Sequence, residues 1–473
     1  MRIQFPSHCS VYSLVLFMTI AGLSSCKKET SPTTGWNYND PDHGGFEVVS
    51  YQEQQTGPGL VFIEGGTFVM GNSQDDVMYD WNNLRRRVTV SSFYMDETEV
   101  RNLDYIEYLF WTSRVLGGLY PEVYRSALPD TLVWRDPMAY NEPFVENYLR
   151  HPAYRDYPVV GVSWVQASRY ADWRTDRVNE MILIRRGIID FDPESLFTTE
   201  AYYAGLYEGT VRRNLPDMDP RGTGERRVRQ EDGILLPRYR LPTEAEWEFA
   251  ALGLIGNTVE ERILEGRVYP WAGNTIRSSE RKTRGIFMAN VQRGRGDMMG
   301  VAGNLNDGGE ITVPVYSYWP NDYGLYNMAG NVNEWVKDVY RPLSHEDVAG
   351  FRPFRGNVFQ TLDLNANGEP QIDSLGRLVY KPDTIQRRNY RSPNNIGYLD
   401  GDSLSVIQGD SLMYNYGVNT LISDEARVYK GGSWKDRVYW INPGTRRFLN
   451  ENMSTNDIGF RCAMTRVGSP IGY

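Results

Sequence analysis

Three long polar stretches interrupt the regular part of this chain and set the strongest limit on its fold. They cover about residues 117–155, 181–233 and 342–424, and they are charged and irregular in pattern. The apolar runs between them are short, and the 473 residues include 45 Gly and 25 Pro. Because short elements separated by irregular segments do not build a helical bundle, the sequence predicts a loop-rich globular protein of another class.

The aromatic content and the net charge further limit which kind of protein this can be. The chain has 32 Tyr and 12 Trp, which predicts a core packed with large amphipathic rings. Its formal net charge of -10 disfavours a nucleic-acid partner, because such a surface needs clustered Lys and Arg.

Local patterns predict a few short strands and helices. The segment 60–71 predicts two strands around a Gly-Gly turn, and 93–100 a third strand. Helices are predicted from about Asn102, after an N-cap at Ser163, and from Pro242. The expected inner face of the first helix consists of Leu103, Ile106, Leu109 and Phe110.

The first 25 residues have the layout of a secretory signal peptide. A basic residue is followed by an apolar run over 11–21, which is too short to span a bilayer, and by small residues. Leu23-Ser24-Ser25-Cys26 resembles the lipobox of bacterial lipoproteins, which implies cleavage before Cys26 and acylation of its thiol. The polar segment 26–58 is then a tether. The alternatives for the apolar run are a membrane anchor and a buried helix.

Cysteine and histidine usage limits the chemistry. Cys9 lies in the signal and Cys26 would carry lipid, so Cys462 remains alone and the mature chain has no intrachain disulfide. We expect Cys462 to be a buried structural thiol. The only histidines are scattered, at His8, His43, His151 and His345, which excludes a multi-histidine zinc or copper site.

Eight short motifs occur in order between Leu60 and Arg466. They are FIEGGTFVMG (62–71), ETEV (97–100), PVVGVSW (158–164), LPTEAEWEFA (241–250), YPWAGN (269–274), GLYNMAGNVNEW (324–335), KGGSW (430–434) and IGFR (458–461). The series closely resembles the sulfatase-modifying-factor, or formylglycine-generating-enzyme-like, family. The resemblance implies an α+β fold, a C-type-lectin variant that is rich in loops and has short strands and few helices. This domain would cover residues 59–466, with the three polar stretches as insertions and 467–473 as a tail.

The resemblance also shows which chemistry is missing. Active members use two cysteines, five residues apart, that bind copper(I) and oxidise a substrate cysteine. At the matching positions this chain has Asp436 and Ile441, and neither residue supplies the soft thiolate that copper(I) requires. The iron-dependent branch of the family needs a histidine site, which the four scattered histidines of this chain, one of them in the signal, do not provide. The resemblance therefore implies a catalytically inactive domain.

The calcium ligands of the family are better preserved. One set would be the side chains of Asn327 and Glu334 with the carbonyls of Gly330 and Val332. The second would be Asn290, the carbonyl of Val291, Asp307 and the carbonyl of Gly309. Such mixed oxygen shells suit calcium. The alternative is that Asn327 and Glu334 only stabilise a tight turn.

Aromatic residues in the first insertion have two interpretations. Trp134, Tyr140 and Tyr148 could pack inside the domain or contact a partner, and packing is the favoured interpretation.

Within this fold family, the lipobox, the tether and the inserted segment 351–359 resemble the gliding-motility and type IX secretion lipoproteins that include GldK and PorK, with GldJ a close second. The resemblance implies a structural ring or scaffold component at the periplasmic face of the outer membrane, with a GldN/PorN-like partner. Two other classes stay open: an oxidative enzyme of the parent family, and a lectin-like binder of glycan or peptide.

Overall fold

The computed structural model describes residues 29–72, 82–194, 196–264, 266–292, 309–341, 349–383 and 424–468. These residues form two compact units. The smaller unit lies within 1–52 and 212–233, and the larger within 53–211 and 234–473. Two predicted site residues, Cys26 and Asp307, lie outside the described residues.

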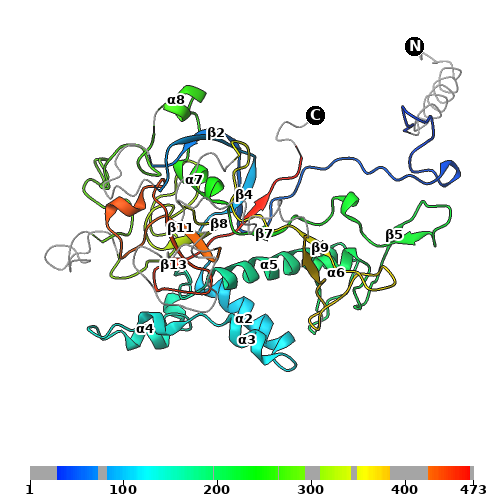
Figure 1. The fold of residues 1–473 in the computed structure, drawn as a ribbon, viewed down its shortest axis with the longest axis horizontal. Coiled ribbons are helices and arrows are strands. Elements are labelled where there is room, and N and C mark those ends of the chain that lie inside the picture. Colours follow the sequence, from blue (N-terminus) through cyan, green and yellow to red (C-terminus); the bar gives the residue numbers. More distant parts are fainter. Residues whose placement is uncertain are drawn as a thin grey trace, which may run out of the picture. The chain divides into compact units, whose positions relative to one another are not determined.

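Two four-stranded sheets form the frame of the larger unit (Figure 1). The first has the order β1 (Leu60–Ile63), β4 (Phe93–Asp96), β14 (Ala463–Thr465) and β7 (Tyr239–Arg240). The second has the order β12 (Arg447–Asn450), β11 (Ala426–Lys430), β8 (Asn333–Val339) and β13 (Ile458–Gly459). Neighbouring strands are antiparallel, apart from the parallel pair β13 and β8.

Short hairpins and helices surround these sheets. The hairpins are β2 (Gly66–Met70) with β3 (Arg86–Val90), and β9 (Gln360–Leu362) with β10 (Tyr380–Pro382). The helices are α2 (Asn102–Leu116), α3 (Pro121–Ala127), α4 (Glu142–Asn147), α5 (Trp164–Arg185), α6 (Thr199–Tyr203), α7 (Glu244–Leu252) and α8 (Val259–Leu264), with short 3-10 turns η2 (Thr131–Trp134), η3 (Pro152–Tyr154) and η10 (Val438–Ile441). None of the helices in the described part of the chain combines the length and apolar character needed to cross a bilayer.

Capping residues explain where two of the helices begin. The Ser163 hydroxyl accepts from the backbone N–H of Gln166, and the Gln166 side chain accepts from the backbone N–H of Ser163. Thr243 and Glu246 form the same reciprocal pair at the start of α7. Each pair satisfies backbone donors that a helix leaves open at its first turn. The predicted start at Ser163 and the predicted α+β fold are confirmed.

Apolar side chains form two principal cores, one on each side of the first sheet. In one, α7 packs against β2, β3 and β8, and its Trp247 and Phe249 are fully buried. In the other, α2 and α5 bring Tyr105 and Tyr170 against Phe460. Buried rings therefore supply much of the packing, as the composition predicts.

The inner face of α2 differs from the prediction. Leu109 is buried and Ile106 packs against the same core, as predicted, but Leu103 and Phe110 are exposed. Tyr105 and Tyr108 are buried in their place. These two rings contact each other edge to face at 5.4 Å between centroids. The prediction was wrong for Leu103 and Phe110, because it left out the tyrosines, whose large rings also bury apolar surface.

The smaller unit combines part of the predicted tether with part of the second insertion. It contains η1 (Pro41–His43), β5 (Leu215–Pro216), β6 (Glu225–Arg226) and η4 (Gln230–Asp232). Residues 29–52 are thus part of a compact unit, and it is held by side-chain contacts that are described below.

Candidate functional site

The second sheet gathers polar side chains where the family would hold its cysteines. β11 ends at Lys430 and is followed by Gly431 and Gly432, both with positive φ, after which the chain turns through Ser433 to Asp436. A Cβ on Gly432 would lie 2.7 Å from Ile441 Cγ2, so only glycine allows this close approach. Arg447 from β12 faces the same turn.

Asp436 is the centre of this cluster. Arg447 donates to it from Nη1 to Oδ1 at 2.7 Å and from Nη2 to Oδ2 at 2.6 Å. The Ser433 hydroxyl and the Asn333 amide donate at 2.7 and 3.1 Å. Burial opposes ionisation, but these hydrogen bonds outweigh it, and the pKa of Asp436 lies below its ordinary value. The group is therefore a fixed carboxylate with its donors already in place.

Arg447 is held as firmly as its partner. Its guanidinium lies 4.6 Å from the ring centroid of Trp440 and 5.0 Å from that of Tyr429. It also donates to Asn333 Oδ1 at 2.6 Å. Stacking on two rings and a bidentate carboxylate contact leave the guanidinium little freedom to act on a substrate.

Ile441 lies in an apolar environment. It is fully buried in a cluster with Tyr269, Phe287, Val291 and Ala329. The two positions where the resemblance places cysteines are thus an ion-paired acid and a core aliphatic residue. Neither has the chemistry to hold copper(I).

The one cysteine in the described residues is also unsuited to reaction. Cys462 is fully buried, as predicted, and burial raises the pKa of its thiol. A thiol in this state stays protonated at neutral pH, and the protonated form is a poor nucleophile and metal ligand.

The first insertion packs against this region. Trp134 stacks on Trp434 of the Gly-Gly-Ser-Trp segment, with ring centroids 6.0 Å apart and planes 22° apart. Trp134 and Tyr148 are buried, so packing is confirmed for both. Tyr140 is 84% exposed, and the packing prediction was wrong for it, because it lies beyond the turn closed by Asp136 and Ala139.

The first predicted calcium set surrounds a buried ion pair. Glu334 accepts from Arg461 Nε and from the Trp247 indole, both at 2.7 Å, and its other oxygen accepts from Arg461 Nη2 at 2.5 Å. Glu334 and Arg461 are both fully buried. Three of roughly four acceptor positions on the carboxylate are therefore filled, and its charge is balanced by a guanidinium.

Asn327 is the member of that set with an open acceptor. Its amide nitrogen donates to Glu99 at 3.0 Å and to the Val315 carbonyl at 2.9 Å. Its Oδ1 is buried and has no hydrogen-bond partner, which is the kind of atom that a cation would use. Because Glu334 is satisfied without a cation, calcium at Asn327, Gly330, Val332 and Glu334 stays a prediction.

The second calcium set lies beside the first. The Asn290 carbonyl accepts from the backbone N–H of Asn331 at 3.0 Å, and the Asn290 amide donates to the Ile311 carbonyl at 2.8 Å. A Cβ on Gly309 would lie 3.0 Å from the Asn290 amide nitrogen, so these two residues are neighbours. Val291, the residue after Asn290, is buried. Since Asp307 lies outside the described residues, this set also stays a prediction.

A buried charge network near β11 was not predicted. Lys430 Nζ contacts Glu244 at 3.2 Å and Glu248 at 2.9 Å, and Arg446 contacts Glu244 at 2.7 Å. Burial opposes ionisation of Glu244, but Arg446 and Lys430 outweigh it, and its pKa falls to about 2. All charges are balanced, so the network ties α7 to the second sheet.

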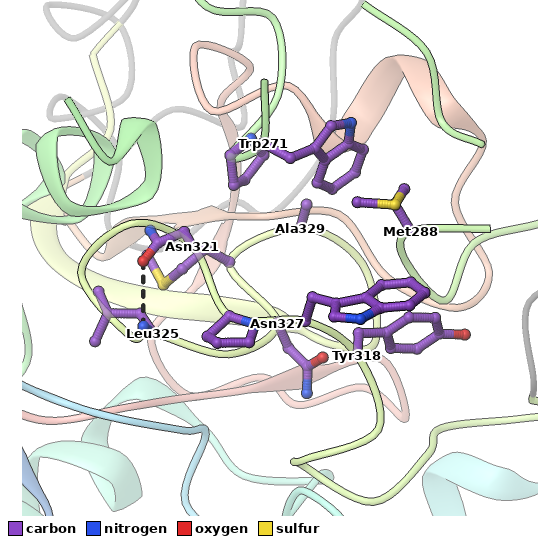
Figure 2. Close-up of a pocket in the computed structure, with 11 residues that line it drawn as sticks. Trp271, Met288, Tyr318, Asn321, Leu325, Asn327 and Ala329 are labelled. Carbon is purple, nitrogen blue, oxygen red and sulfur yellow. Dashed lines mark hydrogen bonds between the residues drawn. The ribbon is translucent and has the colours of Figure 1, made fainter. Parts of the chain in front are cut away.

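The cavity shown in Figure 2 is small and lies apart from Asp436. Its volume is about 30 Å³, and its lining includes Trp271, Met288, Tyr318, Asn321, Leu325 and Ala329. The Asn321 side chain accepts from the backbone N–H of Leu325 at 3.1 Å, and the Asn327 amide points away from Trp271 (Figure 2). Ligand pockets usually reach hundreds of Å³, so this space suits one or two water molecules.

Two curated relatives and one solved structure are among the proteins that resemble this chain. The formylglycine-generating enzyme of Mus musculus is 26% identical over 317 residues, which are 62% of this chain and 61% of that enzyme, so the chain spans less than two thirds of its length. The inactive C-alpha-formylglycine-generating enzyme 2 of Mus musculus is 25% identical over 351 residues, 69% of this chain and 82% of that protein. PvdO from Pseudomonas aeruginosa has a TM-score of 0.42 and 16% identity, covering 88% of this chain and 100% of that chain.

The family match extends over most of the sequence. Residues 45–466 match the sulfatase-modifying factor enzyme 1-like domain, a range that includes the Asp436 cluster and both predicted calcium sets. The chain therefore belongs to the sulfatase-modifying factor enzyme 1-like family.

Proposed function

We propose that this protein is a catalytically inactive, structural lipoprotein of the outer membrane, anchored through Cys26 and facing the periplasm. It serves as a ring or scaffold component of the type IX secretion and gliding-motility machinery, of the GldK/PorK kind with GldJ as the close alternative. Its proposed partners are further copies of itself and a GldN/PorN-like periplasmic protein.

The Asp436–Arg447 pair carries the inactive part of this proposal. A carboxylate held by two guanidinium contacts occupies the first cysteine position, and buried Ile441 occupies the second. A relative that is itself named inactive, at 25% identity, supports the same conclusion. Relatives named as formylglycine-generating enzymes also match, so activity is the competing function to be tested.

A structural role also agrees with how the first insertion is built. Trp134 and Tyr148 fix it to the domain, while Tyr140 and Met138 project from it into solvent. An insertion that is packed onto the domain and also exposes large apolar residues is suited to contacts with other proteins.

We also propose that calcium stabilises the loops that carry Asn290 and Asn327. When bound, the ion would supply charge to an oxygen-rich loop pair and would have no part in a reaction. The buried Oδ1 of Asn327 supports its presence there.

Copper binding and thiol oxidation test the absence of activity. The purified chain is titrated with copper(I) beside an active formylglycine-generating enzyme, and both are given a cysteine-containing sulfatase peptide with oxygen. We expect copper loading and peptide oxidation only in the active enzyme. Tight copper binding with turnover of the peptide by this chain would overturn the proposal.

Cross-linking in membranes tests the scaffold role. Cells are treated with a short amine-reactive cross-linker, and chains linked to this protein are identified by mass spectrometry. We expect links between copies of the chain and to a single periplasmic partner. A protein that stays monomeric and links to no partner would contradict the role.

A further inference from the structure

Residues 29–48 are folded onto themselves and form a small knob at the start of the described chain. The backbone N–H of Tyr38 donates to the Glu29 carbonyl at 2.8 Å, and that of Asn39 donates to the Phe46 carbonyl at 2.9 Å. The Asn39 side chain exchanges two further hydrogen bonds with the backbone of Val48, at 3.0 and 2.9 Å. We call residues 29–48 the N-terminal knob.

The N-terminal knob is fixed to the other half of the smaller unit. Arg226 Nε donates to Glu47 at 2.7 Å, and the backbone N–H of Met218 donates to the other Glu47 oxygen at 2.9 Å. The hydrogen bond from Arg226 lowers the pKa of Glu47, so this pair stays charged. A Cβ on Gly45 would lie 1.8 Å from the Met218 carbonyl oxygen, so the two backbones are in direct contact. The knob therefore keeps its orientation within the unit.

Large apolar side chains face solvent on this knob and just after it. Trp36 is 57% exposed, Phe46 67% and Tyr51 66%. In segment 212–233, the other half of the same unit, no large hydrophobic side chain is comparably exposed. Exposed apolar residues concentrated on one segment mark a contact surface.

The position of the proposed lipid indicates that this surface contacts the membrane. Only three residue steps separate Cys26 from Glu29, and an extended chain covers at most about 3.6 Å per residue, or roughly 11 Å in all. A knob on so short a spacer cannot leave the surface in which the acyl chains are buried. The intervening Lys27 and Lys28 favour anionic headgroups.

We propose that the N-terminal knob is a membrane-contacting foot whose Trp36 and Phe46 enter the interfacial layer of the lipid bilayer beside Cys26. This inference rests on the proposed lipidation of Cys26. Tryptophan is enriched at membrane interfaces because its ring is apolar and its indole N–H is polar. The Glu47–Arg226 contact then transmits the orientation of the knob to residues 212–233.

Site-specific fluorescence tests the foot. The full chain is produced with its lipid and reconstituted into vesicles of phosphatidylethanolamine and phosphatidylglycerol. Trp36→Cys and Phe46→Cys are each labelled with an environment-sensitive dye, while buried Cys462 stays unlabelled. Met138→Cys, at a position that is 94% exposed in the larger unit, is the matched control. Mass spectrometry confirms acylation of Cys26 in every preparation.

We expect a several-fold rise in emission and strong quenching by nitroxide-labelled lipids at positions 36 and 46, and neither effect at position 138. If Cys26 is acylated but positions 36 and 46 behave like position 138, the foot is disproved and the lipid anchor stands. If Cys26 carries no lipid, both the anchor and the foot are overturned.

Discussion

Arg447 holds Asp436 through two hydrogen bonds, of 2.7 Å from Nη1 to Oδ1 and 2.6 Å from Nη2 to Oδ2. The pair joins β12 to the turn after β11, where the family's reactive cysteine would stand. This interaction keeps the carboxylate charged and occupies its hydrogen-bond acceptor positions. It therefore stabilises the fold and leaves the carboxylate unavailable for a reaction.

Breaking this pair is expected to cost stability. Arg447→Met removes the cation and leaves Asp436 with only neutral donors, so we expect a loss of about 2–4 kcal/mol in unfolding free energy by urea denaturation. Arg135→Met is the matched control, because the pair of Arg135 with Glu142 is largely exposed and should contribute little. Equal stability of the two variants would contradict a structural role for the Asp436 cluster.

The first insertion is expected to be part of the folded core at Trp134. Trp134→Ala removes the ring that stacks on Trp434 and leaves a cavity, so we expect a loss of roughly 3–5 kcal/mol. Tyr140→Ala changes an 84% exposed side chain and should shift stability by no more than about 0.5 kcal/mol. Calorimetry of both variants measures the difference. A Trp134→Ala protein that melts like wild type would show that the insertion is not coupled to the domain.

The fold was predictable because its short motifs carry local information. Ser163 with Gln166 is an N-terminal capping pair that can be recognised along the chain, and the Gly431-Gly432 turn needs residues that tolerate positive φ. Burial of Cys462 also followed from its place in a short apolar strand region. These features depend on neighbours in sequence.

The contacts around the site were not predictable because they join distant residues. Lys430 pairs with Glu244 and Glu248, more than 180 residues away, and each of these residues alone resembles an ordinary surface charge. The sequence identified Asp436 only as the residue that replaces a cysteine of the family. Its partner Arg447 could not be predicted, because the contact depends on the pairing of β12 with β11.

Calcium is expected to raise thermal stability, and two variants locate it. Asp307→Ala should abolish the shift in melting temperature if the second set binds the ion, while Asn327→Ala should abolish it if the first set does. The measurement is differential scanning fluorimetry with calcium and with EDTA. If wild type melts at the same temperature in both, neither set binds calcium with useful affinity.

Stability is also expected to depend on the protonation of Glu99. This residue is buried, and it accepts hydrogen bonds from Asn327 at 3.0 Å and from Asn331 at 2.9 Å. Burial raises the pKa of Glu99 to about 7 from 4.5, because the attraction of Arg461 is offset by the repulsion of Glu334 and does not compensate for the lost water. Burial and the nearby Glu244 likewise raise the pKa of Asp338 to about 7.

The sign of the effect follows from proton uptake. Between pH 4.5 and 7 the folded protein keeps a proton on Glu99 that the unfolded chain releases, so the unfolding free energy falls as the pH rises through this range. Glu99→Gln cannot ionise and should reduce that fall by on the order of 1–3 kcal/mol, while Asp338 maintains a residual slope. Urea denaturation of both proteins at pH 5 and pH 8 measures the difference. If wild type is more stable at pH 8 than at pH 5, or if Glu99→Gln has an unchanged slope, the buried carboxylate is charged in the folded state and Arg461 neutralises it together with Glu334.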